Sequence, residues 1–179
     1  MTAPSSAPGA SGAPASSGRS SGASSGTASG TAEPGSARAE TAALQDALAA
    51  EHVAVWGYGT VGAALPAADR SAVGSSAEAH RDLRDRVAAL LTAQGVDPVP
   101  TEAAYALPFP VLSAVDAAAL AVVLEDGTTT AWVWVLDQAA QRRTRELAVG
   151  AAAAAEVRAV TWRQRAGTTP ATSATPGLP

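Results

Sequence analysis

Three ionisable residues, Glu51, His80 and Glu125, lie inside apolar patterns that have helical spacing. Each is flanked at intervals of three or four residues by apolar side chains, as Glu51 is by Leu48 and Val55. This spacing places the ionisable group on the face of a helix that packs into a core. Buried carboxylates and imidazoles are rare unless they are paired, bound to a metal or functional. The sequence therefore predicts a buried polar site built from three helices.

The combination of glutamates and a histidine on separate helices is typical of di-iron four-helix bundles. Their pattern has one Glu on each of two helices and a Glu-x-x-His pair on each of the other two. Glu51 and Glu125 fit the two single-glutamate positions, and His80 fits one of the two histidines. Three of the six ligands of that pattern are thus present.

The remaining ligand positions carry residues that cannot bind iron. Alanines, Ala77 and Ala155, occur where the paired glutamates are expected, and Arg158 occurs where the second histidine is expected. Arginine stays protonated and has no lone pair to donate to a cation. Arg158 would repel a metal ion and neutralise a carboxylate instead.

Three interpretations of these four residues follow. The preferred one is a metal-free buried network in which Arg158 pairs with Glu51 or Glu125. The second is a mononuclear iron or manganese site formed by His80 and the two carboxylates. The third is that the helix registers differ, so that some of these groups face solvent.

Two neighbours of Glu51 are weaker candidates. His52 lies about 100° around the helix from Glu51, so we expect it at the periphery of the site. Tyr58 lies two turns further along the same stripe, and core packing is its expected role. The alternatives for Tyr58 are a hydrogen bond to a buried carboxylate or a redox function.

Four helices are predicted to position these residues, at about residues 38–65, 69–94, 115–139 and 141–165. Ser113 is the expected N-cap of the third helix, and Gly95 is suited to end the second. The first and last connections are short, which predicts two antiparallel hairpins. The middle connection is long and contains four prolines, so it can cross from one end of a bundle to the other. Two hairpins joined by a long crossover are typical of an all-α, ferritin-like four-helix bundle.

The composition predicts two disordered tails and excludes several functional classes. Residues 1–37 and 167–179 consist mainly of Gly, Ser, Ala, Pro and Thr, which cannot bury enough apolar surface to order a chain. The net charge of −4 argues against nucleic-acid binding, and the absence of cysteine excludes disulfides and thiolate metal sites. The longest apolar run, residues 117–124, is too short to span a membrane, and no secretory signal pattern is present. We expect a cytoplasmic protein with neither nucleic-acid nor membrane partners.

Three segments resemble one known family in combination. They are ALQDALAAEHVAVWGYG, AHRDLRDRVAALL and DPVPTEAAYALPFPV, at residues 43–59, 79–91 and 97–111. Together they resemble an actinobacterial ferritin-like domain family of unknown function, over about residues 40–166. The resemblance implies the ferritin-like bundle, without an established activity or bound cofactor.

These observations favour a non-catalytic bundle that acts by association with an unidentified protein partner, with a homodimer as one form of that association. Under this hypothesis the polar site sets the register of the helices, and no cofactor is needed. The alternative is a metal-dependent oxidoreductase or iron-handling protein that uses Glu51, His80 and Glu125 as ligands for iron or manganese.

Overall fold

The computed structural model describes residues 34–178, and four long helices make up most of this part of the chain. They are α1 (Pro34–Ala64), α2 (Arg70–Ala93), α3 (Ala114–Gln138) and α4 (Arg142–Ala166). A short 3-10 turn, η1 (Ala67–Asp69), precedes α2, and no strand occurs between residues 34 and 178. The four helices agree with the prediction to within a few residues, although α1 begins inside the predicted N-terminal tail. Residues 1–33 of that tail lie outside the described residues.

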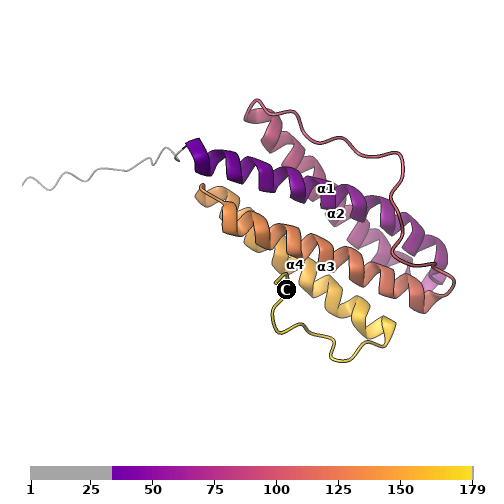
Figure 1. Ribbon diagram of the computed structural model, residues 1–179. Coiled ribbons are helices and arrows are strands. Elements are labelled where there is room, and N and C mark those ends of the chain that lie inside the picture. The colour runs from indigo at the N-terminus through magenta and orange to yellow at the C-terminus, as the bar shows by residue number, and fades with distance from the viewer. Residues whose placement is uncertain (1–33, 179) are drawn as a thin grey trace, which may run out of the picture. The chain divides into compact units, whose positions relative to one another are not determined.

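The helices form two antiparallel pairs, α1 with α2 and α3 with α4 (Figure 1). α3 also packs against α1 and so joins the two pairs, whereas α2 and α4 are not closely packed. Residues 94–113 connect α2 to α3 and run along the length of the bundle from one end to the other (Figure 1). This connection makes α2 and α3 point in the same direction.

The ends of α2, α3 and α4 follow from local sequence. Ser113 caps α3, because its Oγ accepts a hydrogen bond of 3.1 Å from the backbone N–H of Asp116. The Asp116 carboxylate in turn accepts from the backbone N–H of Leu112 at 3.0 Å, which completes a reciprocal cap. Gly95 and Gly167 follow α2 and α4 with φ values of 73° and 72°, a left-handed conformation that favours glycine. The predicted roles of Ser113 and Gly95 are confirmed.

The start of α4 is capped by a side chain from another helix. Glu40 of α1 is 2% exposed, and its carboxylate accepts from the Gln141 backbone N–H at 2.8 Å and from the Thr144 hydroxyl at 2.7 Å. A carboxylate is favourable at this position because the N-terminus of a helix carries a partial positive charge. Glu40 therefore ties the first turns of α1 to the start of α4.

We expect Glu40→Ala to lower the free energy of unfolding by about 1–2 kcal/mol, because it leaves these two donors without their acceptor. Urea denaturation monitored by circular dichroism measures the loss. Asp46→Ala, on the exposed face of the same helix, is the control and should change stability by less than about 0.5 kcal/mol. Equal effects of the two substitutions would contradict the cap.

The buried apolar side chains form two clusters, one in each half of the bundle. The first includes Leu44, Leu48, Val87, Leu91, Trp132, Val135 and Ala148. The second includes Tyr58, Val61, Val73, Leu120, Ala121, Leu124 and Trp162. Small alanines in both clusters let the helices approach closely, as the alanine-rich composition predicts.

The sequence of α4 has two stripes that could face the bundle, one with Ala151 and Arg158 and the other with Val149 and Val157. Ala151 and Ala155 are buried, whereas Val149 and Val157 are 52% and 69% exposed. The stripe that contains Ala151 and Arg158 therefore faces the bundle. On α3, Trp132 is buried and Trp134 is 48% exposed. Residues two positions apart on a helix point in nearly opposite directions, so these two tryptophans cannot face the same core.

α3 is long and apolar enough to cross a membrane by length and composition, and 44% of its most apolar window is buried within the bundle. Its longest continuous apolar run, residues 117–124, is short because Glu125 and Asp126 interrupt it. The core helix of a bundle passes the same test, and α3 carries the buried Glu125. Passing the length and composition test is therefore weak evidence for a membrane span.

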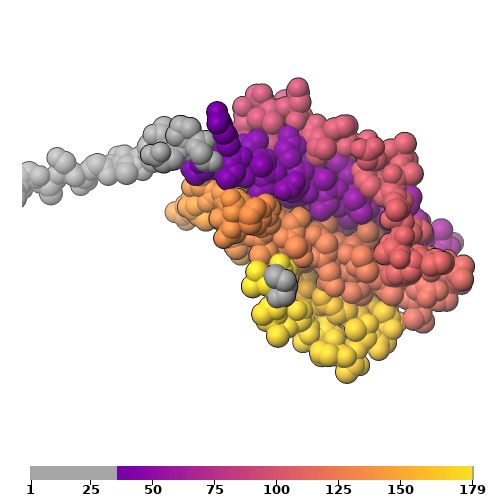
Figure 2. Space-filling model, viewed as in Figure 1, coloured from indigo at the N-terminus to yellow at the C-terminus, as the bar shows by residue number. Residues whose placement is uncertain are grey.

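The long connection is anchored on α1. Gln45 donates a hydrogen bond to the Asp97 carbonyl and accepts one from the Val99 backbone N–H, both at 2.7 Å. Further along, the Tyr105 ring meets the Trp56 ring edge to face, with a centroid distance of 5.8 Å. In the space-filling view, the connection covers part of α1 and reaches the start of α3 (Figure 2). These anchors hold residues 97–105 against α1.

The segment after α4 has no helix, but it contacts the bundle. The Ala171 carbonyl accepts a hydrogen bond of 3.2 Å from Arg163, and Gly177 lies against Val133 of α3. An added Cβ at Gly177 would come within 2.6 Å of Val133 Cγ2, so this approach requires glycine. Residues 167–178, which the composition assigned to a disordered tail, thus run back along α3 and α4.

Arg163 also holds α3 and α4 together beneath this segment. Its side chain is 9% exposed, donates to Glu156 at 2.8 Å and forms an ion pair with Asp126. The hydrogen bond that Arg163 donates to Glu156 is the main reason that the pKa of Arg163 is raised above its ordinary value. Burial raises the pKa of Asp126 despite the nearby guanidinium.

Candidate functional site

The predicted polar residues meet at the centre of the bundle, and all four helices contribute to the site. Glu51 comes from α1, His80 from α2, Glu125 from α3 and Arg158 from α4. The first three are 0% exposed, which rules out the interpretation in which a shifted register turns them toward solvent. Their flanking residues belong to both apolar clusters, so these four residues, called here the central network, lie between the two halves of the core.

His80 bridges the two carboxylates. Its Nδ1 lies 2.7 Å from Glu51 Oε2, and its Nε2 lies 3.3 Å from Glu125 Oε1. A carboxylate can only accept a hydrogen bond, so an imidazole between two carboxylates is best satisfied when both of its nitrogens carry protons. This state is the imidazolium cation.

The electrostatics of His80 agree with this assignment. Burial opposes the charged form of the ring, but the hydrogen bonds and charges of Glu125 and Glu51 outweigh it and raise the pKa of His80 above its ordinary value. His80 therefore keeps its proton to a higher pH than an exposed histidine does.

Glu125 is the most heavily hydrogen-bonded member of the central network. Arg158 Nε donates to both of its oxygens, at 2.9 and 3.0 Å, and the Tyr58 hydroxyl donates to Oε1 at 2.5 Å. Burial acts against ionisation of Glu125, but hydrogen bonds from His80 and Arg158 prevail and lower the pKa of this carboxyl. Burial and the Glu125 charge raise the pKa of Tyr58, so its hydroxyl keeps its proton and remains a donor.

Glu51 is satisfied from two sides. Its Oε1 accepts a hydrogen bond of 2.7 Å from the indole N–H of Trp132, and its Oε2 faces His80. All four carboxylate oxygens of Glu51 and Glu125 therefore have donors. With two carboxylates, one imidazolium and one guanidinium, the central network has no net charge.

The chemistry of this donor set does not fit a metal ion. Both nitrogens of His80 point at carboxylates, and the guanidinium of Arg158 lies against the carboxylate that would face the metal. Between residues 34 and 178, no group of three or more His, Asp or Glu side chains is arranged to hold a metal ion. One orphaned donor remains, since the buried Nη2 of Arg158 has no hydrogen-bond partner. That atom is a donor and cannot serve as a ligand.

Comparison with known proteins places this arrangement in a family. The sequence model of a family described as a domain of unknown function, DUF4439, matches residues 43–179. The chain belongs to the DUF4439 family. The match to this family includes all four residues of the central network, and it continues through the segment that follows α4.

A solved structure resembles this DUF4439 chain over most of its length. It is the crystal structure of a conserved hypothetical protein, rv2844, from Mycobacterium tuberculosis. The two sequences are 40% identical, the match covers 71% of this chain and 96% of the other, and the TM-score is 0.70. No curated protein matches this sequence. The actinobacterial source of this neighbour and the unknown function of the DUF4439 family agree with the resemblance seen in the sequence.

The two weaker candidates of this DUF4439 domain occupy different places. His52 lies outside the central network, half-buried, with Nε2 at 3.2 Å from the Val99 carbonyl, so its predicted peripheral position is confirmed. Tyr58 is 1% exposed and belongs to the core, but it also donates to Glu125. Tyr58 therefore has both the expected packing role and the hydrogen bond to a buried carboxylate that was its alternative role.

Sequence reasoning missed the part played by Trp132. A tryptophan inside an apolar stripe is expected to serve in packing, yet the indole N–H of Trp132 donates to Glu51 across the bundle. A signal was available, because Trp132 follows Glu125 by two helical turns on the same stripe. A buried indole N–H usually has a hydrogen-bond partner, and buried carboxylates were already expected nearby.

Proposed function

We propose that this chain is a ferritin-like four-helix bundle whose metal site has been replaced by the charge-neutral central network, and that it is a non-catalytic protein acting by association. Two antiparallel helix pairs joined by a connection that runs the length of the bundle support the ferritin-like assignment. The observation that carries the proposal is that His80 lies between two carboxylates while Arg158 neutralises one of them.

The central network is suited to fixing the register of the helices. It forms a polar layer between two apolar clusters, and each helix supplies one charged member. Sliding any helix by one turn would place a charge against apolar side chains and leave its partners unpaired, which is costly in a low-dielectric interior. Apolar packing alone tolerates such shifts more easily.

Metal content tests the non-catalytic assignment. We expect protein produced in medium supplemented with iron and manganese, and then passed through a desalting column, to hold far less than one metal ion per chain by inductively coupled plasma mass spectrometry. We also expect a chelator to leave the melting temperature unchanged, because no folding energy would come from a metal.

A near-stoichiometric metal content that is lost in Glu51→Ala would overturn this proposal and favour the alternative, a metal-dependent oxidoreductase or iron-handling protein. Glu78→Ala provides the matched control, since Glu78 is exposed and pairs with Arg81 on the surface of α2. Metal retained in both variants would indicate binding elsewhere on the chain.

The outer face of α4 supports the association part of the proposal. Val149 and Val157 lie two turns apart on this helix and are 52% and 69% exposed, with the exposed Ala153 between them. We propose that a second copy of the chain packs on this stripe. Sedimentation velocity should then show a dimer that Val157→Arg converts to a monomer, whereas a monomeric wild type would exclude the homodimer.

A further inference from the structure

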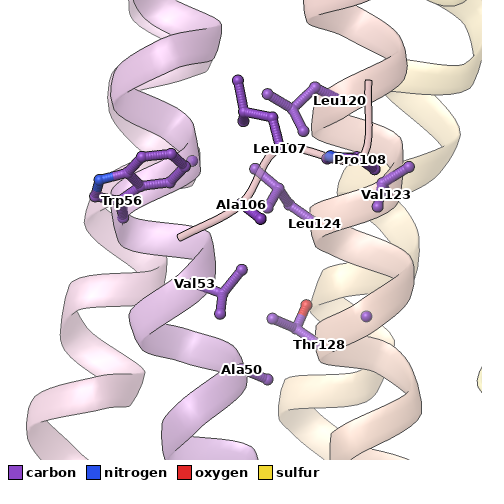
Figure 3. A pocket seen from close by; sticks show the side chains of 12 residues that line it. Ala50, Val53, Trp56, Ala106, Leu107, Pro108, Leu120, Val123, Leu124 and Thr128 are labelled. Atoms are coloured by element: carbon purple, nitrogen blue, oxygen red, sulfur yellow. The ribbon is translucent and has the colours of Figure 1, made fainter. Parts of the chain in front are cut away.

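A pocket of about 460 Å³ lies along the seam between α1 and α3, partly covered by the connection from α2 (Figure 3). This volume falls within the range of roughly 300–1,000 Å³ that is typical of small-molecule sites. The pocket is separate from the central network, because Leu124 of α3 and Gly57 of α1 meet between them. An added Cβ at Gly57 would come within 2.7 Å of Leu124, so the glycine lets this leucine close the floor.

The wall of the pocket is apolar throughout. No charged side chain lines it, and the one hydroxyl, that of Thr128, already donates a hydrogen bond of 3.0 Å to the Glu125 carbonyl. Trp56 and Leu107 provide the largest surfaces at one end. A ligand part that fills this pocket must therefore be uncharged and must not need hydrogen bonds.

The pocket is elongated along the helices. Figure 3 shows Ala50 opposite Thr128 at one end, and Leu107 of the connection between Trp56 and Leu120 at the other. From Ala50 to Gly57, α1 advances by about 10 Å at 1.5 Å per residue. This extent along a narrow seam suits a single flexible hydrocarbon chain better than a flat ring system.

Neither residues 2–33 nor the C-terminal segment is suited to fill this pocket. Residues 2–33 contain no Val, Ile, Leu, Phe, Trp or Tyr, so their sequence has no large apolar side chain to fill the pocket. The C-terminal segment lies against the other side of α3, with Gly177 at Val133. We propose that the pocket binds the hydrocarbon chain of a fatty acid, with the carboxylate left in solvent.

Titration with cis-parinaric acid, a fluorescent fatty acid, tests this proposal. We expect saturable binding of one molecule per chain, with energy transfer from tryptophan because Trp56 lines the pocket. The test variant is Gly127→Leu. Gly127 lines the pocket, and an added Cβ there meets no atom within 4 Å, so the new side chain has open space and occupies part of the ligand volume. Excluding two methylene groups of the ligand would suffice for roughly tenfold weaker binding.

The matched control is Gly150→Leu on α4, where an added Cβ also meets no atom within 4 Å but which does not line this pocket. It should bind cis-parinaric acid like the wild type, and circular dichroism should show both variants folded. Absence of binding to the wild type, or equal binding by both variants, would overturn the proposal. A dimer that Gly127→Leu dissociates would also overturn it, because the pocket would then receive a second copy. Binding to phospholipid vesicles without binding of the free acid would exclude a soluble fatty acid as ligand.

Discussion

Replacing Glu125 by alanine should lower the free energy of unfolding by about 3–5 kcal/mol, because it leaves the buried His80 and the partly buried Arg158 without their shared counter-ion. His80 would keep only Glu51 as a partner, and Arg158 would lose both of its hydrogen bonds to carboxylate oxygens. The Tyr58 hydroxyl would lose its acceptor as well. Urea denaturation at constant pH measures the change.

A surface control and a double-mutant cycle show whether the residues of the central network are energetically coupled or contribute independently. Glu78→Ala removes a glutamate from an ion pair on the exposed surface of α2 and should cost less than about 1 kcal/mol. The double substitution Glu125→Leu with Arg158→Leu should cost less than the sum of the two single leucine substitutions, because no unpaired charge remains between these two positions. Additive losses in this cycle would contradict coupling between the two residues.

The second large effect is a fall in stability as the pH rises above neutrality. The pKa of His80 is raised in the folded protein, whereas an unfolded histidine has a pKa of about 6.5. The folded state therefore binds the proton more tightly. The resulting stability is fully present below about pH 6.5 and is lost as the pH rises through the folded pKa, at up to about 1.4 kcal/mol per pH unit.

Chemical denaturation at a series of pH values from 6 to 9 measures this slope. The chain has two histidines, so His52→Gln is the natural control and should retain the slope. His80→Gln should be less stable at pH 6 and should lose most of the pH dependence. An unchanged slope in His80→Gln would show that another group titrates, and would remove the assignment of His80 as the cation.

Glu125 produces the opposite trend in acid. Its pKa is lowered in the folded protein, so its contribution is present above the unfolded pKa of about 4.3 and is lost as the pH falls through the folded value. The two residues together place the maximum of their joint contribution at mildly acidic pH. This follows from a carboxylate and an imidazolium that stabilise each other's charged forms.

Breaking the central network and removing it are different events. A single deletion leaves charges unpaired, whereas a full apolar replacement often leaves a protein equally stable or more stable. We therefore assign to the network the selection of one helix register rather than a large net stabilisation. A layer in which each helix supplies one charge pairs all of its charges in only one register of the helices.

The periodicity of the sequence predicted which residues are brought together. Glu51, His80 and Glu125 stand at inward positions of their stripes, and the start of α3 and the end of α2 follow from Ser113 and Gly95. These features are local, because helical geometry fixes the direction of a side chain relative to its own helix. Arg158 stands where the di-iron pattern predicts a second histidine, and the structure places it against Glu125 rather than Glu51.

The periodicity of the sequence does not predict which residues of different helices contact each other. Trp132 reaching Glu51, Glu40 capping α4 and Gly177 seating on Val133 each join residues that are far apart in sequence or lie beyond a helix end. Such contacts depend on the rotation and spacing of helices, which small alanine and glycine side chains leave undetermined in the sequence. The pocket between α1 and α3 likewise arises only when the connection is laid along the seam.

By itself, the sequence determined that four helices bury a histidine and two glutamates, because a period near 3.6 residues fixes which side chains face inward. The tertiary structure alone decided that His80 lies between the two carboxylates, with Arg158 on one of them and Trp132 on the other. The physical reason is that the protonation of His80, and the ability of these side chains to bind a metal ion, depend on distances of a few ångströms between groups on different helices. Spacing along one chain does not encode those distances.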